Sequence, residues 1–337
     1  MNRKKICVIG GGRWGQNHIR TLFQMDSLGG IVEANPTRLK TLLKDYPVQG
    51  FTDLESAMAH SFDGYTVAVP AQFHYEVAKT LLSKGQHVLV EKPMTLSAET
   101  SLELVELAEK NNAQLMVGHV LLFHPAIRKI KELIDIGKIG KLHYIYSNRL
   151  NLGTVRTEEN VFWSLAPHDI SVLDYFVGQS AIDIDSKASK FLQKDVHDYS
   201  MTQLTYPDNI HAHIFVSWLH PFKEQRLVVI GSEGMLTFED SAVEKEIRFY
   251  DKQIQFEKGI PVKVENPTEV IKFEEGIPIK VENPTEIIKF EPKQPLKEEL
   301  AYFVENLDKK IEIADGKSGY EVVKVLEKAQ KSIDEKE

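Results

Sequence analysis

The stretch Lys4–Gly15, KKICVIGGGRWG, constrains the fold more than any other part of the chain. Its first half, Ile6–Ile9, is a run of β-favouring apolar residues between lysines and glycines, which predicts a strand buried on both faces. Gly10, Gly12 and Gly15 follow with the spacing G-x-G-x-x-G. After a strand and before a helix, this spacing predicts a turn that binds the phosphates of a dinucleotide, whereas elsewhere it would indicate only a glycine-rich turn.

The composition is that of an ordinary soluble globular protein, with 42% hydrophobic and 27% charged residues among 337. This length allows two domains. The formal net charge of −8 argues against nucleic acid or an anionic membrane as the main partner. The chain has no apolar run of the roughly 18 residues that suggest a membrane span, and no signal peptide is recognised, so we expect a cytoplasmic protein. Cys7 is the single cysteine and is expected in the core.

Strand and helix signals alternate strictly from the N-terminus to about residue 123. Such alternation predicts a parallel, doubly wound sheet of the Rossmann kind, with a dinucleotide-binding domain over residues 1–123. Ligands of these sheets bind beyond the carboxyl ends of the strands. Pro70, Glu91, Lys92 and His119 follow predicted strands, so we expect them near the ligand.

The end of the second predicted strand indicates which dinucleotide binds. An acidic residue there takes the ribose hydroxyls of NAD, whereas a basic residue accommodates the 2′-phosphate of NADP. The chain has Glu33 and Asn35 at this place and Arg38 in the helix that follows. Glu33 favours NAD. Arg38 keeps NADP open, and it is equally a solvated residue of the helix.

Lys92 stands between an acidic residue and Pro93, directly after the predicted strand His87–Val90. The proline fixes the backbone and the strand fixes the position, so the ammonium is expected to point to where a nicotinamide binds. A surface lysine in a strand-to-helix loop is the alternative. The glycines upstream favour the functional interpretation.

From about His124 the pattern changes to successive strands, which predicts an α+β substrate and oligomerisation domain, residues 124–295, on a large, mostly antiparallel sheet. Helices in residues 296–337 are expected to pack back on the domains. A helix predicted over His168–Phe176, with Pro167 near its start, places His168 where it could face the cofactor. A neutral imidazole there can accept a hydroxyl proton near neutral pH.

The motifs resemble the glucose-fructose oxidoreductase and inositol dehydrogenase family, also called Gfo/Idh/MocA. The resemblance rests on VIGGGRWGQNH, VAVPAQFHYEVA, GQHVLVEKPMTLS, GKIGKLHYI, APHDI and PLKEELAYFVENL. It implies NAD(P)-dependent hydride transfer on a sugar, polyol or related carbinol, with Lys92 and His168 as catalytic residues. The expected cofactor site comprises Gly10, Gly12, Arg13, Trp14, Gly15, Glu33, Asn35, Arg38, Pro70, His74, Glu91 and Lys92.

One segment points to a substrate and another departs from the family pattern. The run NRLNLGTVRTEEN resembles members that oxidise the 3-hydroxyl of nucleotide-linked N-acetylhexosamines for surface-polysaccharide synthesis. Many members carry Asp four residues before the histidine, where this chain has Ser164. The expected substrate contacts are Lys92, His119, Arg149, Asn151, Arg156, Ser164 and His168. Arg149, Asn151 and Arg156 are almost equally well explained as surface residues.

Two alternatives to this function stay open. A free sugar or inositol dehydrogenase is the close one, and a non-catalytic NAD(P)-binding regulatory protein is one of another class. The resemblance also suggests a homo-oligomer, a dimer or tetramer through the C-terminal sheet. No metal is expected, because the closest pairs among the 12 histidines lack carboxylates in a recognisable arrangement.

A tandem repeat interrupts the second domain. FEKGIPVKVENPTEVIK, Phe256–Lys272, is followed by FEEGIPIKVENPTEIIK, Phe273–Lys289. Each copy predicts a strand, an Asn-Pro turn and a strand, and Pro261 and Pro278 place these strands at a sheet edge. A tolerated duplication of a surface hairpin is the simple interpretation, and a lengthened subunit contact is the alternative.

Overall fold

The computed structural model of the protein describes residues 3–153, 155–257, 259–265, 268–274, 277–283 and 285–336. The chain divides into two compact units, one made of Met1–His124 with Lys293–Lys328 and the other of Pro125–Pro292 with Ala329–Glu337. Each unit is built on a sheet of its own.

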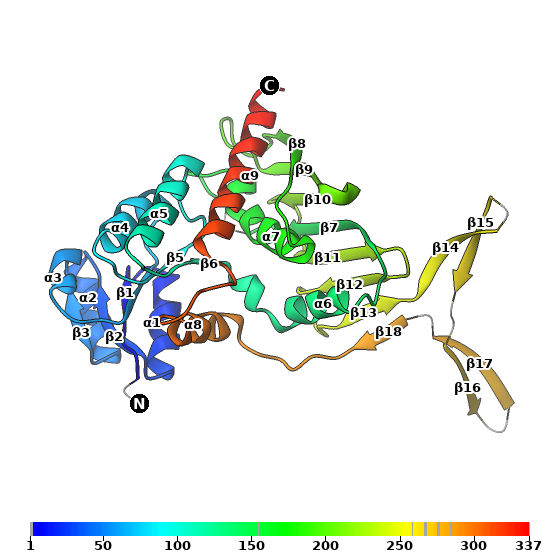
Figure 1. The fold of residues 1–337 in the computed structure, drawn as a ribbon, viewed down its shortest axis with the longest axis horizontal. Helices are drawn as coiled ribbons and strands as arrows, with labels where there is room; N and C mark the ends of the chain where they lie inside the picture. Colours follow the sequence, from blue (N-terminus) through cyan, green and yellow to red (C-terminus); the bar gives the residue numbers. More distant parts are fainter. Residues whose placement is uncertain are drawn as a thin grey trace. The chain divides into compact units, whose positions relative to one another are not determined.

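The sheet of the first unit has the strand order β3-β2-β1-β4-β5-β6, and all its pairs are parallel (Figure 1). The strands are β1 (Ile6–Ile9), β2 (Leu28–Val32), β3 (Gln49–Phe51), β4 (Gly64–Val67), β5 (Val88–Glu91) and β6 (Leu115–Gly118). The order reverses between β1 and β4, the switch point at which doubly wound sheets bind ligands. The predicted Rossmann sheet is confirmed.

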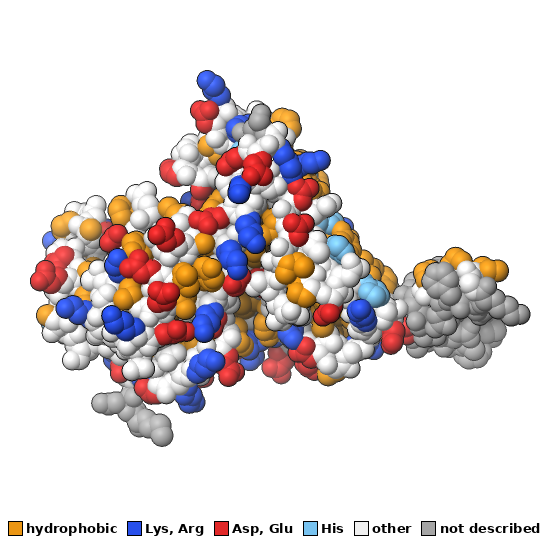
Figure 2. All heavy atoms as spheres, turned by 45° about the horizontal axis from the view of Figure 1, so that its top comes forward, with side chains coloured by type: hydrophobic (Ala, Val, Ile, Leu, Met, Phe, Trp, Pro, Cys, Tyr) orange, Lys and Arg blue, Asp and Glu red, His pale blue; other side chains and the backbone are white. Residues whose placement is uncertain are grey.

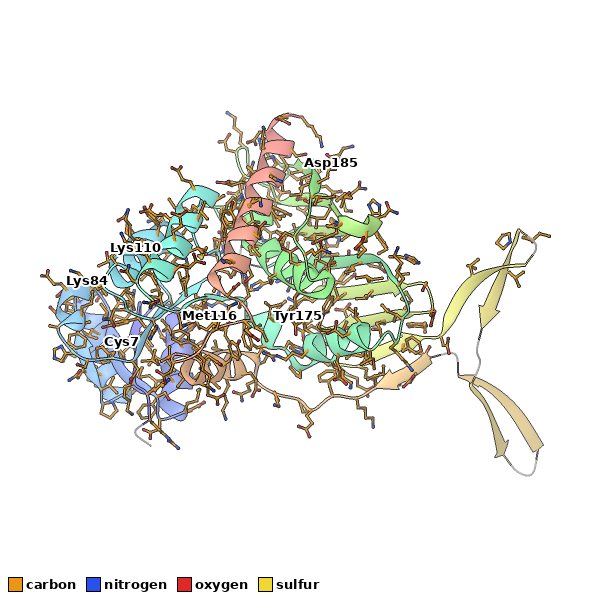
Figure 3. The ribbon with its side chains drawn as sticks, in the orientation of Figure 1. Cys7, Lys84, Lys110, Met116, Tyr175 and Asp185 are labelled. Carbon is orange, nitrogen blue, oxygen red and sulfur yellow. The ribbon has the colours of Figure 1, made fainter. Side chains whose placement is uncertain are left out.

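Strands β1, β4, β5 and β6 are buried along their whole length, as central strands of a parallel sheet must be. Cys7 of β1 and Met116 of β6 are 0% exposed in this interior (Figure 3). The core position expected for Cys7 is therefore confirmed, and burial raises the pKa of its thiol.

Helices connect these strands, and polar residues cap several of them. Asn35, Asp53 and Ser97 accept backbone N–H groups at the starts of three helices. A later helix, α8 (Pro295–Glu305), returns to pack against α1 and the short helix η2 (Val120–Phe123). The other helical segments of this unit are α1 (Gly15–Gln24), α2 (Pro36–Asp45), α3 (Leu54–Met58), η1 (Ala71–Phe73), α4 (His74–Leu82) and α5 (Ala98–Lys110), and α9 (Gly316–Asp334) begins in it.

The second unit contains an eight-stranded sheet in the order β18-β13-β12-β11-β7-β10-β9-β8. Only the β7–β10 pair is parallel, so the mostly antiparallel sheet is confirmed. The strands are β7 (Leu142–Leu150), β8 (Asp183–Ser189), β9 (Tyr199–Tyr206), β10 (Ile210–Ser217), β11 (Glu224–Gly231), β12 (Met235–Glu239), β13 (Ile247–Tyr250) and β18 (Thr285–Ile288). Helix α6 (Pro125–Asp135) precedes β7, and η3 (Pro207–Asn209) links β9 to β10.

Helix α7 (Val161–Val177) packs on β7, β9 and β10. The prediction that Pro167 lies near the start of this helix is wrong, because α7 begins at Val161, where Asn160 caps the N–H of Trp163. The buried residues Val161, Phe162 and Ala166 extend the apolar face N-terminally and outweigh the missing N–H of proline. His168 thus lies in the interior of a long helix.

The repeat forms two separate two-stranded sheets, β14 (Lys252–Glu257) with β15 (Ile260–Glu265) and β16 (Thr268–Glu274) with β17 (Ile277–Asn283). The strands on either side of Asn266-Pro267 therefore belong to different hairpins, which differs from the hairpin predicted within each copy. Asn266, Pro267 and Pro284, which belong to the predicted Asn-Pro turns, lie outside the described residues.

Candidate active site

The glycine turn has the geometry of a phosphate-binding loop. Gly10 has φ of +99°, and a Cβ there would lie 2.7 Å from the Ala68 carbonyl oxygen. A Cβ on Gly15 would lie 1.9 Å from the Gly10 oxygen, so both positions require glycine. A Cβ on Gly12 would meet nothing within 4 Å among the described residues, so this backbone is open to a ligand. Arg13 and Trp14 lead from the turn into α1, whose first N–H groups favour phosphate. The turn fits a dinucleotide.

Glu33 joins the glycine turn to the end of β2. Its carboxylate accepts the N–H of Gly11 at 2.9 Å and that of Asn35 at 2.8 Å, and Arg38 Nη1 lies 3.2 Å away. Burial alone would raise the pKa of Glu33, but these donors outweigh it and hold the pKa below its ordinary value. An anion is therefore kept at the end of β2, the place of the ribose-binding acid in NAD-binding folds.

Asn35 and Arg38 are engaged in this local network. The Asn35 Oδ1 atom caps α2 by accepting the N–H groups of Thr37 and Arg38, each at 3.0 Å. A ribose hydroxyl would therefore have to bond to its Nδ2 group. The half-exposed Arg38 side chain is paired with Glu33, which opposes its use for a 2′-phosphate.

The segment after β4 is tied to the segment after β5 by His74. Its Nδ1 lies 2.8 Å from the Pro93 carbonyl and its Nε2 lies 2.9 Å from the Val69 carbonyl. The ring is buried, which lowers its pKa. His74 thus positions the loop that carries Lys92, beside Pro70, the residue that precedes η1.

Glu91 ends β5 directly before Lys92, and its buried carboxylate is surrounded by donors. Trp14 Nε1 and His18 Nε2 contact Oε1, the latter at 2.8 Å, and the Lys92 N–H donates to Oε2 at 3.2 Å. Burial would raise the pKa of Glu91, but His18, Trp14 and Lys92 together lower it. The peptide bond between Lys92 and Pro93 is cis. Lys92 itself is half-buried at the carboxyl edge of the sheet.

His119 follows β6 and is only 1% exposed. Neither ring nitrogen has a hydrogen-bond partner among the described residues, and burial lowers its pKa to about 4. Its electrostatic neighbours are Glu91 and Lys92. His119 is therefore a neutral imidazole beside Glu91, and the predicted contact with a substrate stays a prediction.

In the second unit, an ion pair between the buried Asp169 and the partly buried Arg149 anchors α7 to β7. Asp169 accepts Arg149 Nε at 2.9 Å, Arg149 Nη2 at 3.0 Å and the Ser147 hydroxyl at 2.6 Å. Asp169 is adjacent to His168, and Ser164 lies one helical turn before that histidine. The fork of Arg149 is thus engaged by Asp169, and the predicted contact of Arg149 with a substrate stays a prediction.

The two remaining predicted substrate residues lie just beyond β7. Asn151 donates its backbone N–H to Ser217 at 3.0 Å. Arg156 is exposed and pairs with Glu159 at 3.1 Å. These contacts do not test a role in binding a sugar, which stays a prediction for both residues.

Sequence reasoning missed four residues of these networks: His18, Ser147, Asp169 and Glu299. Asp169 stands in the motif APHDI and Glu299 in PLKEELAYFVENL, both of which were recognised as motifs. In each, the signal is an acidic residue on the face that the helix buries. The residues that interact with Asp169 and Glu299 are distant from them in the sequence, so this signal could not identify the interacting residues.

The part of the chain that the structure describes contains no group of three or more His, Cys, Asp or Glu residues placed to hold a metal ion. Within the same residues, no helix is both long and apolar enough to cross a membrane.

A doubly wound parallel sheet with a phosphate turn, joined to an α+β unit, defines a two-unit dinucleotide-binding protein. Residues 4–119 match the family described as "Oxidoreductase family, NAD-binding Rossmann fold", and residues 127–237 match "GFO/IDH/MocA C-terminal domain". The chain belongs to the Gfo/Idh/MocA oxidoreductase family. Its first unit carries the family's NAD-binding domain.

Two characterised relatives differ in their substrates. Inositol 2-dehydrogenase of Corynebacterium glutamicum is 29% identical over 194 residues, which are 55% of this chain and 58% of the relative. UDP-N-acetylglucosamine 3-dehydrogenase of Acidithiobacillus ferrooxidans is 26% identical over 185 residues, with the same shares of 55% and 58%. The matches thus span less than two thirds of either relative.

Solved structures of the family share the fold over the whole chain. The UDP-N-acetylglucosamine 3-dehydrogenase of Acidithiobacillus ferrooxidans has a TM-score of 0.83 at 19% identity, covering 99% of both chains. The WlbA dehydrogenase of Bordetella pertussis, in complex with NADH and UDP-GlcNAcA, has a TM-score of 0.77 at 18% identity, covering 100% of this chain and 98% of that one. At these identities the likeness shows the fold.

Proposed function

We propose that the protein is an NAD-dependent dehydrogenase that transfers hydride between a sugar carbinol and nicotinamide. The observation that carries this proposal is the setting of Lys92. It follows β5 at the ligand-binding edge of the sheet, next to a buried carboxylate that three donors hold in place. A cation fixed in this way is suited to an oxygen that gains negative charge.

Bound NAD supplies the hydride acceptor when the carbinol is oxidised. The chain's own residues manage the proton and the orientation of the sugar. The Lys92 ammonium donates a hydrogen bond to the carbinol oxygen, and the imidazole of His168 takes the hydroxyl proton as the carbon–hydrogen bond releases its hydride. Ser164 binds a neighbouring hydroxyl, because its own hydroxyl offers a donor and an acceptor.

For the substrate we propose the 3-hydroxyl of a nucleotide-linked N-acetylhexosamine, which serves surface-polysaccharide synthesis. The likeness to the UDP-N-acetylglucosamine 3-dehydrogenase, at 26% identity and a TM-score of 0.83, supports this choice. The 29% identity to an inositol 2-dehydrogenase favours inositol as the second candidate.

We also propose that the protein is a homo-oligomer through the sheet of the second unit. Helix α7 covers one face of this sheet. On the other face Tyr146 stacks on His213 with ring centroids 5.1 Å apart, and Tyr144 bonds to the same histidine. These rings are half-buried, and histidine side chains are visible among hydrophobic ones at the surface in Figure 2. Aromatic rings in a sheet face favour contact with a second copy.

A substrate panel tests the function. The purified protein is mixed with NAD⁺ and, separately, UDP-N-acetylglucosamine, myo-inositol or glucose, and NADH formation is followed. We expect reduction with the nucleotide sugar and none with Lys92→Met. Turnover of inositol or glucose alone would select the second candidate. Calorimetric binding of NADH without turnover of any polyol would favour a regulatory protein.

A further inference from the structure

Glu299 lies where α8 would be expected to carry an apolar residue. It shares the buried face of the helix with Leu300 and Phe303, and its exposure is 0%. Neither carboxyl oxygen has a hydrogen-bond partner among the described residues. A buried acid without partners is costly, so an unexplained one within a packed core demands a role.

The electrostatic neighbour of Glu299 is Glu91. Two carboxylates that interact in a buried site do not both ionise readily, and one of them keeps a proton. Glu91 is the ionised member, because Trp14, His18 and the Lys92 N–H all donate to it. The proton of the pair therefore belongs to Glu299, whose pKa is raised well above its ordinary value by burial and then by the charge of Glu91.

Elements around the pair fix its surroundings. Helix α8 packs against α1, which carries His18, and against η2, which His119 precedes. A Cβ on Gly118 would lie 2.8 Å from Glu91 Cδ, so the Glu91 carboxylate rests on the backbone of β6. The titratable groups that face the pair are His18, His119 and Lys92. His18 is already directed at Glu91, and burial keeps His119 neutral.

We propose that Glu299 is a neutral carboxylic acid whose O–H is directed at the Glu91 carboxylate, and that it is a positioning residue for Lys92. As a fourth donor it stabilises the Glu91 anion without adding charge, and Glu91 holds the Lys92 backbone at 3.2 Å. The chain thus returns by α8 to complete the support of a residue that lies about 200 positions earlier. The role of Lys92 here rests on the proposed function, whereas the acid pair does not.

Infrared spectroscopy of the whole protein tests the acid pair without any substrate. At neutral pH we expect a carbonyl band of one buried, protonated carboxylic acid. The band should disappear in Glu299→Gln and persist in Glu305→Gln, a matched change of an exposed glutamate on the same helix. Absence of the band, or a band that survives Glu299→Gln, would overturn the proposal even if the protein is an active dehydrogenase.

Kinetics test the positioning role. Glutamine keeps a neutral donor, so Glu299→Gln should retain kcat within about twofold, whereas Glu299→Leu should lower kcat by roughly tenfold, about the worth of one buried hydrogen bond. KM for the sugar should change by less than about twofold in both. Equal kcat for the leucine and glutamine variants would overturn the positioning role. An infrared band with no dehydrogenase activity in wild-type protein would leave the acid pair intact and reject the proposed function.

Discussion

Two buried carboxylates stand beside the two proposed catalytic residues, and the protein holds them differently. Glu91 precedes Lys92 at the end of β5, and Asp169 follows His168 in α7. Asp169 is gripped by the two-nitrogen fork of Arg149 and by Ser147. Glu91 is held by an indole, an imidazole and a backbone N–H, with Glu299, the proposed neutral acid, as its electrostatic neighbour.

We call the contacts of Arg149 and Ser147 with Asp169 the fixed clamp. The contacts made to Glu91 by its three donors are the adjustable clamp. The guanidinium of Arg149 stays charged throughout the physiological range and binds Asp169 through two nitrogens, so the fixed clamp contains a permanent cation. The network of Glu91 includes the neighbour Glu299, whose pKa is raised well above its ordinary value, so its balance depends on pH. We infer that α7 is anchored rigidly, whereas the support beneath Lys92 is electrostatically tuned.

The largest effect is expected from breaking the fixed clamp. Asp169→Leu leaves the partly buried Arg149 without its anion, which should lower the free energy of unfolding by about 3 kcal/mol. Glu91→Gln should cost only about 1–2 kcal/mol, since an amide oxygen still accepts from the same donors. Urea denaturation measures both. The double variant Arg149→Leu/Asp169→Leu is the control and should recover much of the loss. Equal costs for the two single variants would erase the distinction between the clamps.

Replacing Lys92 tests whether the adjustable clamp supports a catalytic residue. Lys92→Met should lower kcat at least about a hundredfold while NADH affinity stays nearly unchanged, because an acid/base group is lost without altering the glycine turn. Steady-state kinetics and calorimetry measure the two quantities. His168→Ala should act similarly and alter the limb of the pH profile that reports the base. More than a tenth of wild-type kcat in Lys92→Met would remove Lys92 from the mechanism.

The pH dependence of stability should reveal Glu299. Its folded pKa is raised above the ordinary 4.5, so above about pH 4.5 the unfolded chain loses a proton that the folded protein keeps. Wild-type stability therefore falls as pH rises through this window, by up to about 1.4 kcal/mol per pH unit. Glu299→Gln removes this term, so its stability relative to wild type should rise from about pH 5 to pH 8 in thermal melts. A constant difference would mean that Glu299 ionises normally.

Substitutions of Ser164 test the part of the comparison that concerns α7. If it holds a sugar hydroxyl, Ser164→Ala should raise KM roughly tenfold with a smaller effect on kcat, about the worth of one hydrogen bond. Ser164→Asp, which restores the more common residue, should bring no large gain. A gain in kcat of a hundredfold or more would show that the proton relay is incomplete with serine.

The smallest effect is expected in the repeat, which belongs to neither clamp. Strand β18 pairs with β13, and its sequence Thr285–Ile288 recurs as Thr268–Ile271 with one Val-for-Ile difference. Deleting Phe273–Lys289 should let the first copy take the place of β18, so kcat and the elution volume on a sizing column should not change. Loss of the native oligomer would instead make the repeat a subunit contact.

Local signals predicted much of this protein. The strand before Gly10, the spacing of the glycines and the position of Lys92 after β5 all followed from short stretches. The start of α7 was not predicted correctly. In the sequence, Pro167 indicated a helix start more strongly than the apolar run before it indicated a helix, although Pro167 lies seven residues into α7. In the repeat, the Asn-Pro signal predicted a hairpin within each copy. The structure instead pairs β14 with β15 and β16 with β17, so the strands on either side of Asn266-Pro267 belong to different hairpins.

By itself the sequence determined the Rossmann sheet, the antiparallel sheet and the residues that follow each strand, because hydrophobic periodicity and turn chemistry act between near neighbours. Only the tertiary structure decided that Arg149 pairs with Asp169 and that Glu299 is buried with Glu91 as its electrostatic neighbour. A buried polar group takes its partner from whichever element packs against it. That choice depends on three-dimensional packing between elements far apart in the chain, which no local pattern contains.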